Sequence, residues 1–328
     1  MTVSIQKILD VQPVENSDAL DKVKILGWQV VVKRGEFKQG DLAAYVEIDS
    51  ILPDKPEFSF LANRHFRVQT IRLRGCLSQG IAFPLSILPA GDWQEGQDIT
   101  DVIGAKHYEK TISGTIGGQI ERNFPPFIPK TNEERLQNFP GVLDELRDKA
   151  YIITTKVDGT SCTIYHNNGS FGVCSRNNQM REDDQNVYWK MAKKYDLENK
   201  LKGFEMNIAL QGEVVGPGIQ KNRLNLKELE FLLFDVYDVE KERYMNVTEA
   251  NAVRFSLGLK AVPTVELGPN FNYTFEQLLE LAKGKYEGTK NDQEGIVVRS
   301  FREDFSEILR KRISFKVLNN QFLLDNDE

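Results

Sequence analysis

The sequence predicts an α+β protein of two domains, in which a small β-barrel precedes a larger domain of antiparallel sheets with helices outside. Short apolar runs separated by turn residues fill the first hundred positions, and strand patterns alternate with helix patterns after residue 150. Between them, residues 110–129 are rich in Gly, Ser and Pro and lack an apolar period. A chain of 328 residues can form two cores. We therefore expect one domain over residues 1–110 and a second over residues 111–328.

The first domain is expected to consist mainly of short strands. Glycine and proline separate six candidate strands, which are residues 5–11, 22–25, 29–33, 42–48, 68–73 and 80–83. Short strands around one meandering core are typical of a Greek-key barrel of the OB type. The open face of such a barrel commonly binds nucleic-acid strands, so we expect a nucleic-acid-binding domain.

The second domain is expected to alternate strands with helices. Thr131 and Glu134 have the spacing of a capping box, which predicts that a helix begins there. Thr248 and Thr274 are expected to cap two later helices. Helices are expected at residues 144–150, 184–195, 249–257 and 275–282. Strands are expected at residues 162–165 and 171–174.

The charge of the chain argues against a broad basic surface. The formal net charge is -6, whereas non-specific affinity for nucleic acid comes mainly from Lys and Arg that neutralise phosphates. A local groove remains compatible with this balance. Arg72 and Arg74 are expected to share one strand face by period-two alternation, and with Lys130 they are the candidate RNA contacts.

Cysteine usage and the N-terminus limit the protein class further. Three cysteines and three histidines are scattered without metal-ligand spacing, so neither a disulfide framework nor a zinc site is indicated. The N-terminus lacks the layout of a signal peptide, and no apolar run approaches membrane-spanning length. We expect a cytoplasmic protein, or a nuclear one in a eukaryote, that makes no membrane contact and is a monomer.

The most informative motif is Lys156-Val157-Asp158-Gly159, which follows an apolar run. A strand that ends in this way presents an amine at the floor of a cleft, and the glycine allows the backbone to approach a bound nucleotide. A lysine acts as a nucleophile only after it loses its proton, which requires desolvation or nearby positive charge. The motif therefore predicts a lysine nucleophile.

Five further segments follow this motif, each pairing an apolar strand with a polar residue. In order, the six resemble motifs I, Ia, III, IIIa, IV and V of the covalent nucleotidyltransferases, which include RNA ligases, DNA ligases and capping enzymes. Residues 101–109, 124–135 and 315–324 also resemble one family, the ATP-dependent RNA ligases of the RNA ligase 5 type. The six segments are Lys156-Val157-Asp158-Gly159-Thr160, Cys174-Ser175-Arg176-Asn177, Ala209-Leu210-Gln211-Gly212-Glu213-Val214-Val215, Phe231-Leu232-Leu233-Phe234-Asp235-Val236-Tyr237, Glu294-Gly295-Ile296-Val297-Val298 and Ser314-Phe315-Lys316-Val317.

The resemblance implies a role for each matching residue. Lys156 would attack the α-phosphate of ATP and carry AMP covalently. The carboxylates of Asp158, Glu213 and Glu294 would hold Mg²⁺ or Mn²⁺, with Glu213 also contacting the nucleotide. The remaining nucleotide contacts would come from Thr155, from Arg176 on the ribose or the acceptor phosphate, from Phe234 stacked on adenine beside a bracing Asp235, and from Lys316 on the α-phosphate.

The sequence departs from the family at motif V, which usually carries two alternating lysines. If Lys316 matches the first, the second falls on Leu318, and in the other register the first falls on Ser314. One phosphate contact is therefore missing from the pattern. We consider Lys311, Arg312 and Lys130 as replacements.

The resemblance implies an ATP-dependent RNA ligase that joins a 3′-hydroxyl to a 5′-phosphate through lysyl-AMP and an adenylylated RNA end, with RNA nick repair as the expected setting. Its RNA partner would be a nicked duplex or another pair of ends. Two alternatives stay open at this point. One is a DNA ligase or a GTP-dependent capping enzyme, and the other is a non-catalytic nucleic-acid-binding protein that uses the OB-type barrel alone.

Overall fold

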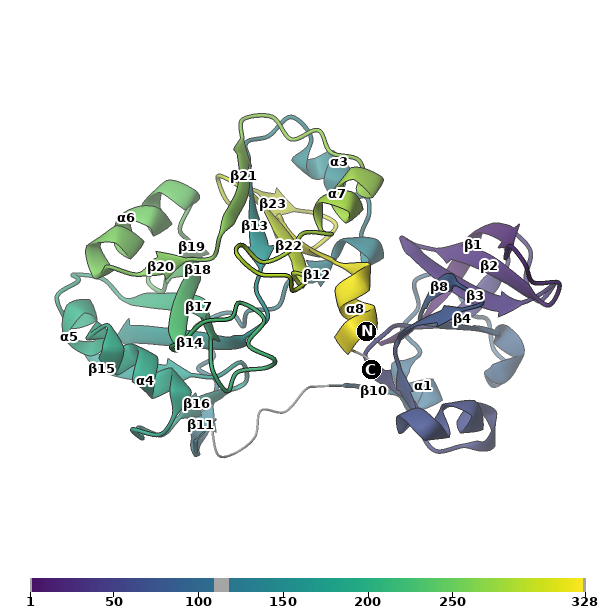
Figure 1. Cartoon of the computed structure of the whole chain (residues 1–328), viewed down its shortest axis with the longest axis horizontal. Coiled ribbons are helices and arrows are strands. Elements are labelled where there is room, and N and C mark those ends of the chain that lie inside the picture. Colours follow the sequence, from purple (N-terminus) through teal and green to yellow (C-terminus); the bar gives the residue numbers. More distant parts are fainter. Residues whose placement is uncertain (1, 109–117, 327–328) are drawn as a thin grey trace. The chain divides into compact units, whose positions relative to one another are not determined.

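The computed structural model describes residues 2–108 and 118–326, and the chain forms two compact units (Figure 1). Unit 1 comprises Met1–Thr111, Leu136–Pro140 and Leu323–Glu328, and unit 2 comprises Ile112–Arg135 and Gly141–Phe322. Part of the predicted connection at residues 110–129 lies outside the described residues, as do the predicted boundary after residue 110 and the end of segment 101–109.

Unit 1 has a five-stranded antiparallel sheet at its centre, in the order β3-β2-β1-β4-β9. The pairing of β1 with β2 shifts register between Ile8 and Asp10, and such a bulge increases the local bend and twist of a long strand. Trp28, Ile5 and Ile8 are fully buried in the core. The strands are β1 (Val3–Pro13), β2 (Leu20–Ile25), β3 (Trp28–Lys33), β4 (Leu42–Val46) and β9 (Ile81–Pro84).

Shorter elements complete unit 1. A three-stranded sheet has the order β10-β5-β6, and β7 pairs with β8 as a hairpin beside β3. Of these strands, β5, β8 and β10 were not predicted. The elements are β5 (Ser50–Ile51), η1 (Pro56–Arg64), β6 (Arg67–Val68), β7 (Thr70–Leu73), β8 (Cys76–Gln79), η2 (Leu85–Ile87), α1 (Thr100–Ile103) and β10 (Lys106–His107).

The expected shared strand face of Arg72 and Arg74 is wrong. Arg72 lies on β7, but Arg74 lies in the two-residue turn that leads to β8, with φ of 52°. Gly75 follows with φ of 82°, and two successive positive φ angles are typical of a type I′ hairpin turn. Turn chemistry therefore overrides strand alternation at this point. Both arginines are exposed.

Unit 2 contains two sheets. The larger runs β11-β16-β15-β14-β17-β18-β19, with β20 paired in parallel to β18. The smaller runs β12-β25-β22-β13-β21, and only its β12 to β25 pair is parallel. The strands of the larger sheet are β11 (Ile120–Asn123), β14 (Thr160–Asn167), β15 (Ser170–Cys174), β16 (Asn178–Met180), β17 (Ile208–Val215), β18 (Glu230–Asp238), β19 (Arg243–Tyr244) and β20 (Lys260–Ala261).

The smaller sheet carries the strand that ends at Lys156. Its strands are β12 (Glu134–Arg135), β13 (Tyr151–Lys156), β21 (Thr264–Gly268), β22 (Gly295–Ser300) and β25 (Ser314–Leu318). A separate hairpin of β23 (Phe305–Ser306) and β24 (Lys311–Arg312) precedes β25.

Helices α4, α5 and α6 cover one face of the larger sheet, where α4 lies beside β15 and α5 beside β14 (Figure 1). Trp189, Leu197 and Leu257 pack there against Ile164 and Leu210. Since side chains alternate along a strand, the polar residues between these apolar ones face the other way. The later helices of the chain are α3 (Val142–Leu146), α4 (Val187–Lys194), α5 (Leu197–Lys202), α6 (Val247–Leu257) and α7 (Phe275–Leu281) in unit 2, η3 (Leu136–Asn138) in unit 1, and α8 (Asn320–Asn326), which belongs to unit 1 from Leu323 on.

One cap prediction is confirmed and two are wrong. Thr274 caps α7 in a capping box with Gln277. Helix α6 is capped by Asn246 instead of Thr248, since the helix begins two residues earlier than expected. No helix begins at Thr131, because the next residues form β12 and pair with β25. Tertiary pairing has overridden the local capping signal.

The segment after β12 belongs to unit 1. The Trp28 indole donates a hydrogen bond to Asn138 Oδ1 at 2.6 Å, and the Asn138 amide donates to Glu47 at 2.9 Å. The Gly27 amide donates to the carbonyl of Gln137 at 2.8 Å. These bonds satisfy polar groups beside the buried Leu136, so the segment is an integral part of unit 1.

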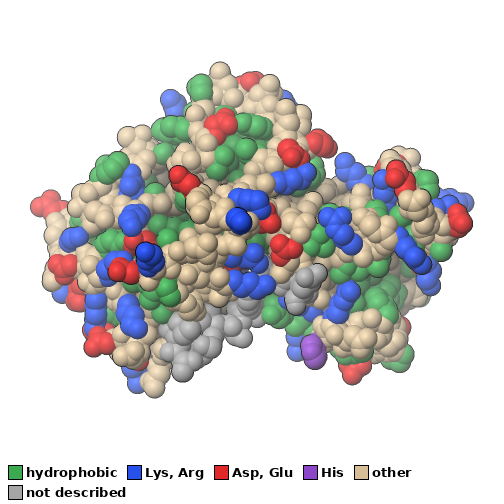
Figure 2. All heavy atoms as spheres, viewed as in Figure 1, with side chains coloured by type: hydrophobic (Ala, Val, Ile, Leu, Met, Phe, Trp, Pro, Cys, Tyr) green, Lys and Arg blue, Asp and Glu red, His purple; other side chains and the backbone are tan. Residues whose placement is uncertain are grey.

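The surface carries both signs of charge. On the face shown in Figure 2, Lys and Arg side chains are interspersed with Asp and Glu and form no single continuous basic area. This agrees with the net charge of -6. Within residues 2–108 and 118–326, no helix combines the length and the apolar character needed to cross a bilayer.

Candidate active site

The candidate site is built around the end of β13. Three neighbouring strands of the smaller sheet bring together residues distant in sequence, because β13 pairs with β22 and β22 pairs with β25. Lys156 lies opposite Gly295, and Val297 lies opposite Lys316, so these rows present Lys156 and Lys316 on the same face. Three of the six sequence motifs thus meet on one sheet.

Two glycines permit close backbone approach at this end of the sheet. A Cβ atom at Gly159 would lie 2.5 Å from the carbonyl oxygen of Val214, and one at Gly295 would lie 2.1 Å from that of Val317. Both distances are shorter than van der Waals contact. Gly295 also has φ of 151°, which disfavours residues with a side chain. The glycines beside Lys156 and Glu294 therefore allow the neighbouring strands to pack.

The amine of Lys156 is surrounded by carboxylates. Its Nζ lies 2.7 Å from Oε2 of Glu294, and both side chains are largely buried. Burial alone would lower the pKa of Lys156, but the charges of Glu294, Glu213 and Asp158 outweigh it and raise that pKa above its usual value. Without a ligand, Lys156 is therefore an ammonium ion held by acids.

Glu213 comes from β17 of the larger sheet, on the face opposite the helices. Burial raises the pKa of this carboxyl, the charge of Lys156 lowers it, and the nearby charges of Glu294 and Asp158 raise it further, to about 8. One ammonium group is thus shared among several carboxylates. A bound cation would relieve this surplus of negative charge.

The acids fit a divalent metal held through water molecules better than one held directly. Among the described residues, no group of three His, Cys, Asp or Glu side chains is arranged to chelate a metal ion. Asp158 is also engaged elsewhere, since its Oδ2 lies 3.3 Å from Nε of Arg223. Mg²⁺ commonly retains several waters and takes only one or two carboxylates. The metal roles of Asp158, Glu213 and Glu294 stay predictions.

Cations gather on the next strands. Lys316 on β25 is the register partner of Arg135 on β12. Burial lowers the pKa of Lys316, and the positive charges of Arg135, Lys156 and Arg176 lower it further, to about 7, despite the opposing charge of Glu294. Three basic side chains near one lysine form a setting suited to a phosphate chain.

Arg135, the register partner of Lys316, is a further candidate for the absent motif V lysine that the sequence analysis did not name. The three candidates named from the sequence are engaged in other contacts. Lys311 binds Glu134 and the carbonyl of Asn132, Arg312 binds Asp235, and Lys130 donates to Asn177. The parallel pairing of β12 with β25, which brings Arg135 beside Lys316, has no local signal in the sequence.

Arg176 lies between the acidic and basic parts of the site. Its charge lowers the pKa values of both Glu213 and Lys316. Its guanidinium also donates to Asn132 Oδ1 at 3.3 Å. Lys130 binds the adjacent Asn177 at 3.1 Å, so the segment before β12 and the turn after β15 are linked by two contacts.

Phe234 lies on the site face of β18 beside an ionic cluster. Its ring packs with Val157, Val215 and Leu232, and Cζ of Arg299 lies 5.7 Å from the ring centroid. Arg299 in turn contacts Asp235 at 3.4 Å. The apolar contacts hold one side of the ring, and the expected stacking of Phe234 on adenine stays a prediction.

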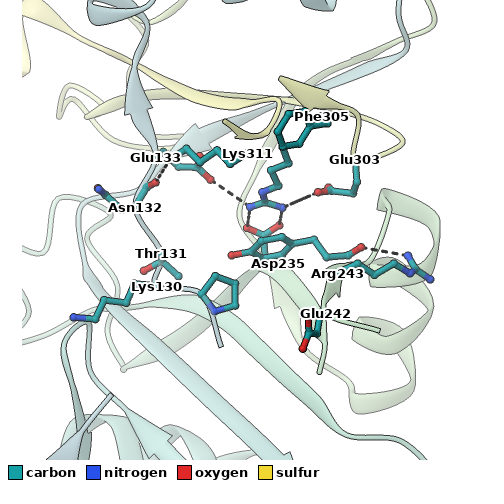
Figure 3. Close-up of a pocket in the computed structure, with 13 residues that line it drawn as sticks. Lys130, Thr131, Asn132, Glu133, Asp235, Glu242, Arg243, Glu303, Phe305 and Lys311 are labelled. Atoms are coloured by element: carbon teal, nitrogen blue, oxygen red, sulfur yellow. Dashed lines mark hydrogen bonds and ion pairs between the residues drawn. The ribbon is translucent and has the colours of Figure 1, made fainter. Parts of the chain in front are cut away.

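The ionic cluster is centred on Asp235, as Figure 3 shows. The Arg312 guanidinium donates two hydrogen bonds to this carboxylate, of 2.9 and 2.5 Å, and forms an ion pair with Glu303 at 3.2 Å. Burial would raise the pKa of Glu133, but Arg312 and Arg299 lower it to about 2. Such fully paired charges give a rigid support next to Phe234.

A cavity of about 360 Å³ opens over the cluster (Figure 3). Asp235, Arg312, Lys130, Asn132 and Phe305 are among its lining residues. Neither Lys156 nor Glu213, Glu294 or Lys316 lines it. The cavity therefore adjoins the site without containing the candidate nucleophile.

Three of the predicted contacts are not brought to Lys156 by the fold of unit 2. Thr155 alternates with Lys156 on β13 and pairs with the buried Ile296, so its side chain faces the other side of the sheet. Arg72 and Arg74 belong to unit 1. A nucleotide contact from Thr155 would therefore have to involve its main chain.

Comparisons with known proteins agree with this arrangement. A family model described as RNA ligase matches residues 149–318, and one described as an OB-fold domain matches residues 2–85. No curated protein sequence matches the chain significantly.

Solved structures match the whole chain. A mutant Naegleria gruberi RNA ligase with ATP and Mn has a TM-score of 0.91 and 33% identity over 100% of both chains. The same ligase with PPi has a TM-score of 0.89 and 34% identity, covering 98% of this chain and 97% of that one. Another mutant, with AMP and Mn, has a TM-score of 0.90 and 33% identity over 98% of each.

Glu213→Gln is expected to change how stability depends on pH. The folded protein retains the Glu213 proton up to about pH 8, whereas the unfolded chain releases it near its ordinary pKa of 4.5. The free energy of unfolding of the parent should therefore fall between these pH values, relative to the variant, by on the order of 1–3 kcal/mol. Denaturant unfolding with a chelator from pH 5 to pH 8 measures this. The exposed substitution Glu287→Gln is the control, and a variant curve parallel to the parent curve would contradict the raised pKa.

Proposed function

The chain belongs to the RNA ligase family, and we propose that it joins a 3′-hydroxyl end of RNA to a 5′-phosphate end through AMP carried on Lys156. The single observation that supports this role best is the position of the Lys156 amine, 2.7 Å from Glu294 at the meeting point of β13 and β22. The chain is an ATP-dependent RNA ligase by family and by its match to ligase structures with ATP, AMP and PPi.

The proposed reaction has three balanced transfers. Nζ of Lys156 attacks the α-phosphorus of ATP, a P–N bond forms, and the P–O bond to pyrophosphate breaks. An oxygen of the RNA 5′-phosphate then attacks the same phosphorus, which releases the lysine and leaves AMP joined to the RNA end through a pyrophosphate bond. Finally the 3′-hydroxyl attacks the RNA 5′-phosphorus, and AMP leaves with its bonding electron pair.

The first transfer needs a neutral amine, whereas the acids around Lys156 favour the ammonium form. Glu213 and Glu294 would hold Mg²⁺ or Mn²⁺ through water, and the metal would supply positive charge that weakens the hold of the acids on the Lys156 proton and stabilises the phosphates. Lys316 and Arg135 would contact phosphate oxygens from the opposite side. In this proposal the acidic residues hold the metal, and the basic residues bind the phosphates.

The base and sugar of ATP would lie against the larger sheet. Phe234 would stack on adenine, since its ring is supported by Val157 and Leu232 and by Arg299. Arg176 would contact the ribose or the RNA 5′-phosphate, because its charge reaches both Glu213 and Lys316. Thr155 would contribute through its backbone.

RNA is the substrate class of the family, and finer features stay proposals. We infer that Arg72 and Arg74 on unit 1 bind the strand with the 3′-hydroxyl, and that Lys130 helps to hold the other end. A nicked duplex as preferred substrate, a role in RNA repair, a monomeric state and a cytoplasmic or nuclear location are predictions on the same footing. The matched ligases do not favour a DNA ligase, a capping enzyme or a non-catalytic protein.

Lys156→Ala should abolish covalent labelling of the protein by ATP labelled at the α-phosphate. The reason is that no other described lysine lies at the end of β13 among the acids. Gel autoradiography measures the label, which acid should remove and alkali should spare. Lys283→Ala, just after α7, is the control because its amine forms an ion pair with the exposed Glu280. Equal labelling of Lys156→Ala would contradict the mechanism, and preferential labelling by GTP would contradict the assignment of adenine.

Arg135→Ala should slow formation of lysyl-AMP by about 10- to 100-fold, which is the range for one lost charge-assisted contact to phosphate. Arg135→Lys should restore part of the rate, because it keeps the charge but loses the fork geometry. Single-turnover labelling over a range of ATP concentrations measures both variants. A rate for Arg135→Ala within about twofold of the parent would show that β12 does not contribute to nucleotide chemistry.

Combined Arg72→Ala and Arg74→Ala substitution should leave lysyl-AMP formation within about twofold of the parent and weaken joining of nicked RNA by about tenfold or more. The defect relative to the parent should shrink as the salt concentration rises, because salt screens the phosphate contacts that only the parent makes. Joining assays at two salt concentrations measure it, with Lys202→Ala on α5 as the control. Unchanged joining would contradict the assignment of Arg72 and Arg74 to RNA binding.

A further inference from the structure

Tyr286 is a buried tyrosine that the sequence motifs do not include. It lies in the loop between α7 and β22, and 4% of its surface is exposed. Its ring packs in the apolar cluster that contains Val157, Leu232 and Phe234. The cluster thus includes Val157, the residue that follows the candidate nucleophile.

The Tyr286 hydroxyl makes three hydrogen bonds, all to backbone groups of the active site. It accepts from the amide of Asp158 at 2.9 Å and from the amide of Glu294 at 3.1 Å. It donates to the carbonyl oxygen of Lys156 at 3.2 Å. A phenol has one donor and two acceptor sites, so its hydrogen-bonding capacity is fully used. Burial and the charge of Glu294 raise the pKa of Tyr286, which keeps the donor proton in place.

These bonds occur where the strand ladder ends. The regular pairing of β13 with β22 runs from Tyr151 opposite Ser300 to Lys156 opposite Gly295. Beyond that last pair, the ladder of backbone hydrogen bonds between the two strands stops. The hydroxyl of Tyr286 takes over, since it joins two backbone groups of the Lys156 to Asp158 segment to the amide of Glu294.

We propose that Tyr286 is a positioning residue that holds the nucleophile Lys156 in register with Glu294 for the transfer of AMP. This inference rests on the proposed function and adds a residue to the same site. Tyr286 touches no reacting atom and acts through the backbone on either side of the amine. A shift of about 1 Å in a nucleophile can slow its reaction 100-fold, so such a brace would have a kinetic effect.

The loop that carries Tyr286 is itself held in one conformation. The amide of Tyr286 donates to Asn291, and the carbonyl of Tyr286 accepts from the amide of Thr289. The side-chain amide of Asn291 donates to the carbonyl of Arg223 at 2.6 Å. Arg223 in turn contacts the Asp158 carboxylate at 3.3 Å. The loop is therefore connected to Asp158 in two ways. Tyr286 bonds to its backbone amide, and Asn291 is linked to its carboxylate through Arg223.

The test is Tyr286→Phe in the full chain, which keeps the ring and removes only the hydroxyl. Single-turnover formation of lysyl-AMP should slow by about 10- to 100-fold at saturating ATP, with the ATP concentration for half-maximal rate changed less than about threefold. Joining of RNA supplied already adenylylated should fall less, because that step does not use the lysine as a nucleophile.

Tyr273→Phe is the matched control. It also removes a phenol oxygen, but that oxygen donates to the side chain of Glu266 and not to the backbone beside Lys156. Its labelling rate should equal that of the parent. A rate for Tyr286→Phe within about twofold of the parent overturns the proposal, and so do equal losses in both steps together with a lowered melting temperature, which would indicate a general effect on stability.

A measurement on the unsubstituted protein covers the case in which Tyr286→Phe does not fold. The amide protons of Asp158 and Glu294 should exchange with deuterated water much more slowly than exposed amides, because each donates to the buried hydroxyl. Exchange at the unprotected rate would overturn the proposal. Absence of lysyl-AMP in the unsubstituted protein would instead refute the proposed function, and the exchange result would still report on Tyr286.

Discussion

The contact between the Lys156 amine and the Glu294 carboxylate is the interaction on which the rest of the site depends. It forms at the last paired residues of β13 and β22, so the position of each charge is set by backbone hydrogen bonds. Glu213 adds a buried carboxyl from the other sheet, and burial together with the charges of Glu294 and Asp158 raises its pKa to about 8. In this arrangement the acids keep the Lys156 amine protonated, and added positive charge would weaken that effect.

The architecture of unit 2 explains how two sheets can share one site. Helices α4, α5 and α6 bury the apolar face of the larger sheet, which leaves its other face for Glu213 and Phe234. Glycines at positions 159 and 295 remove the Cβ atoms that would otherwise collide with neighbouring backbone. Both positions therefore require a residue without a side chain, so that the strands that carry the candidate site can pack closely.

The charges are segregated along the strands. Acids gather at the end of β13 near Lys156, and basic residues gather on β12 and β25 around Lys316 and Arg135. A nucleotide triphosphate with its metal presents the complementary pattern. The separate cluster around Asp235 is neutralised internally by Arg299 and Arg312, so it supports the site mechanically and adds little net field.

The sequence by itself determined the fold class and most strands, and it singled out the candidate nucleophile and its candidate acids, because these depend on local patterns such as apolar runs that end in polar residues. The cap at Thr274 was equally readable, since a capping box is a local interaction. Only the tertiary structure decided that the Thr131 signal gives no helix, that Arg135 lies beside Lys316, and that Tyr286 bonds to three backbone groups of the site. Each of these depends on a contact between segments far apart in the chain. Such contacts form when strands pair and loops close over them, and no pattern within a short window encodes that outcome.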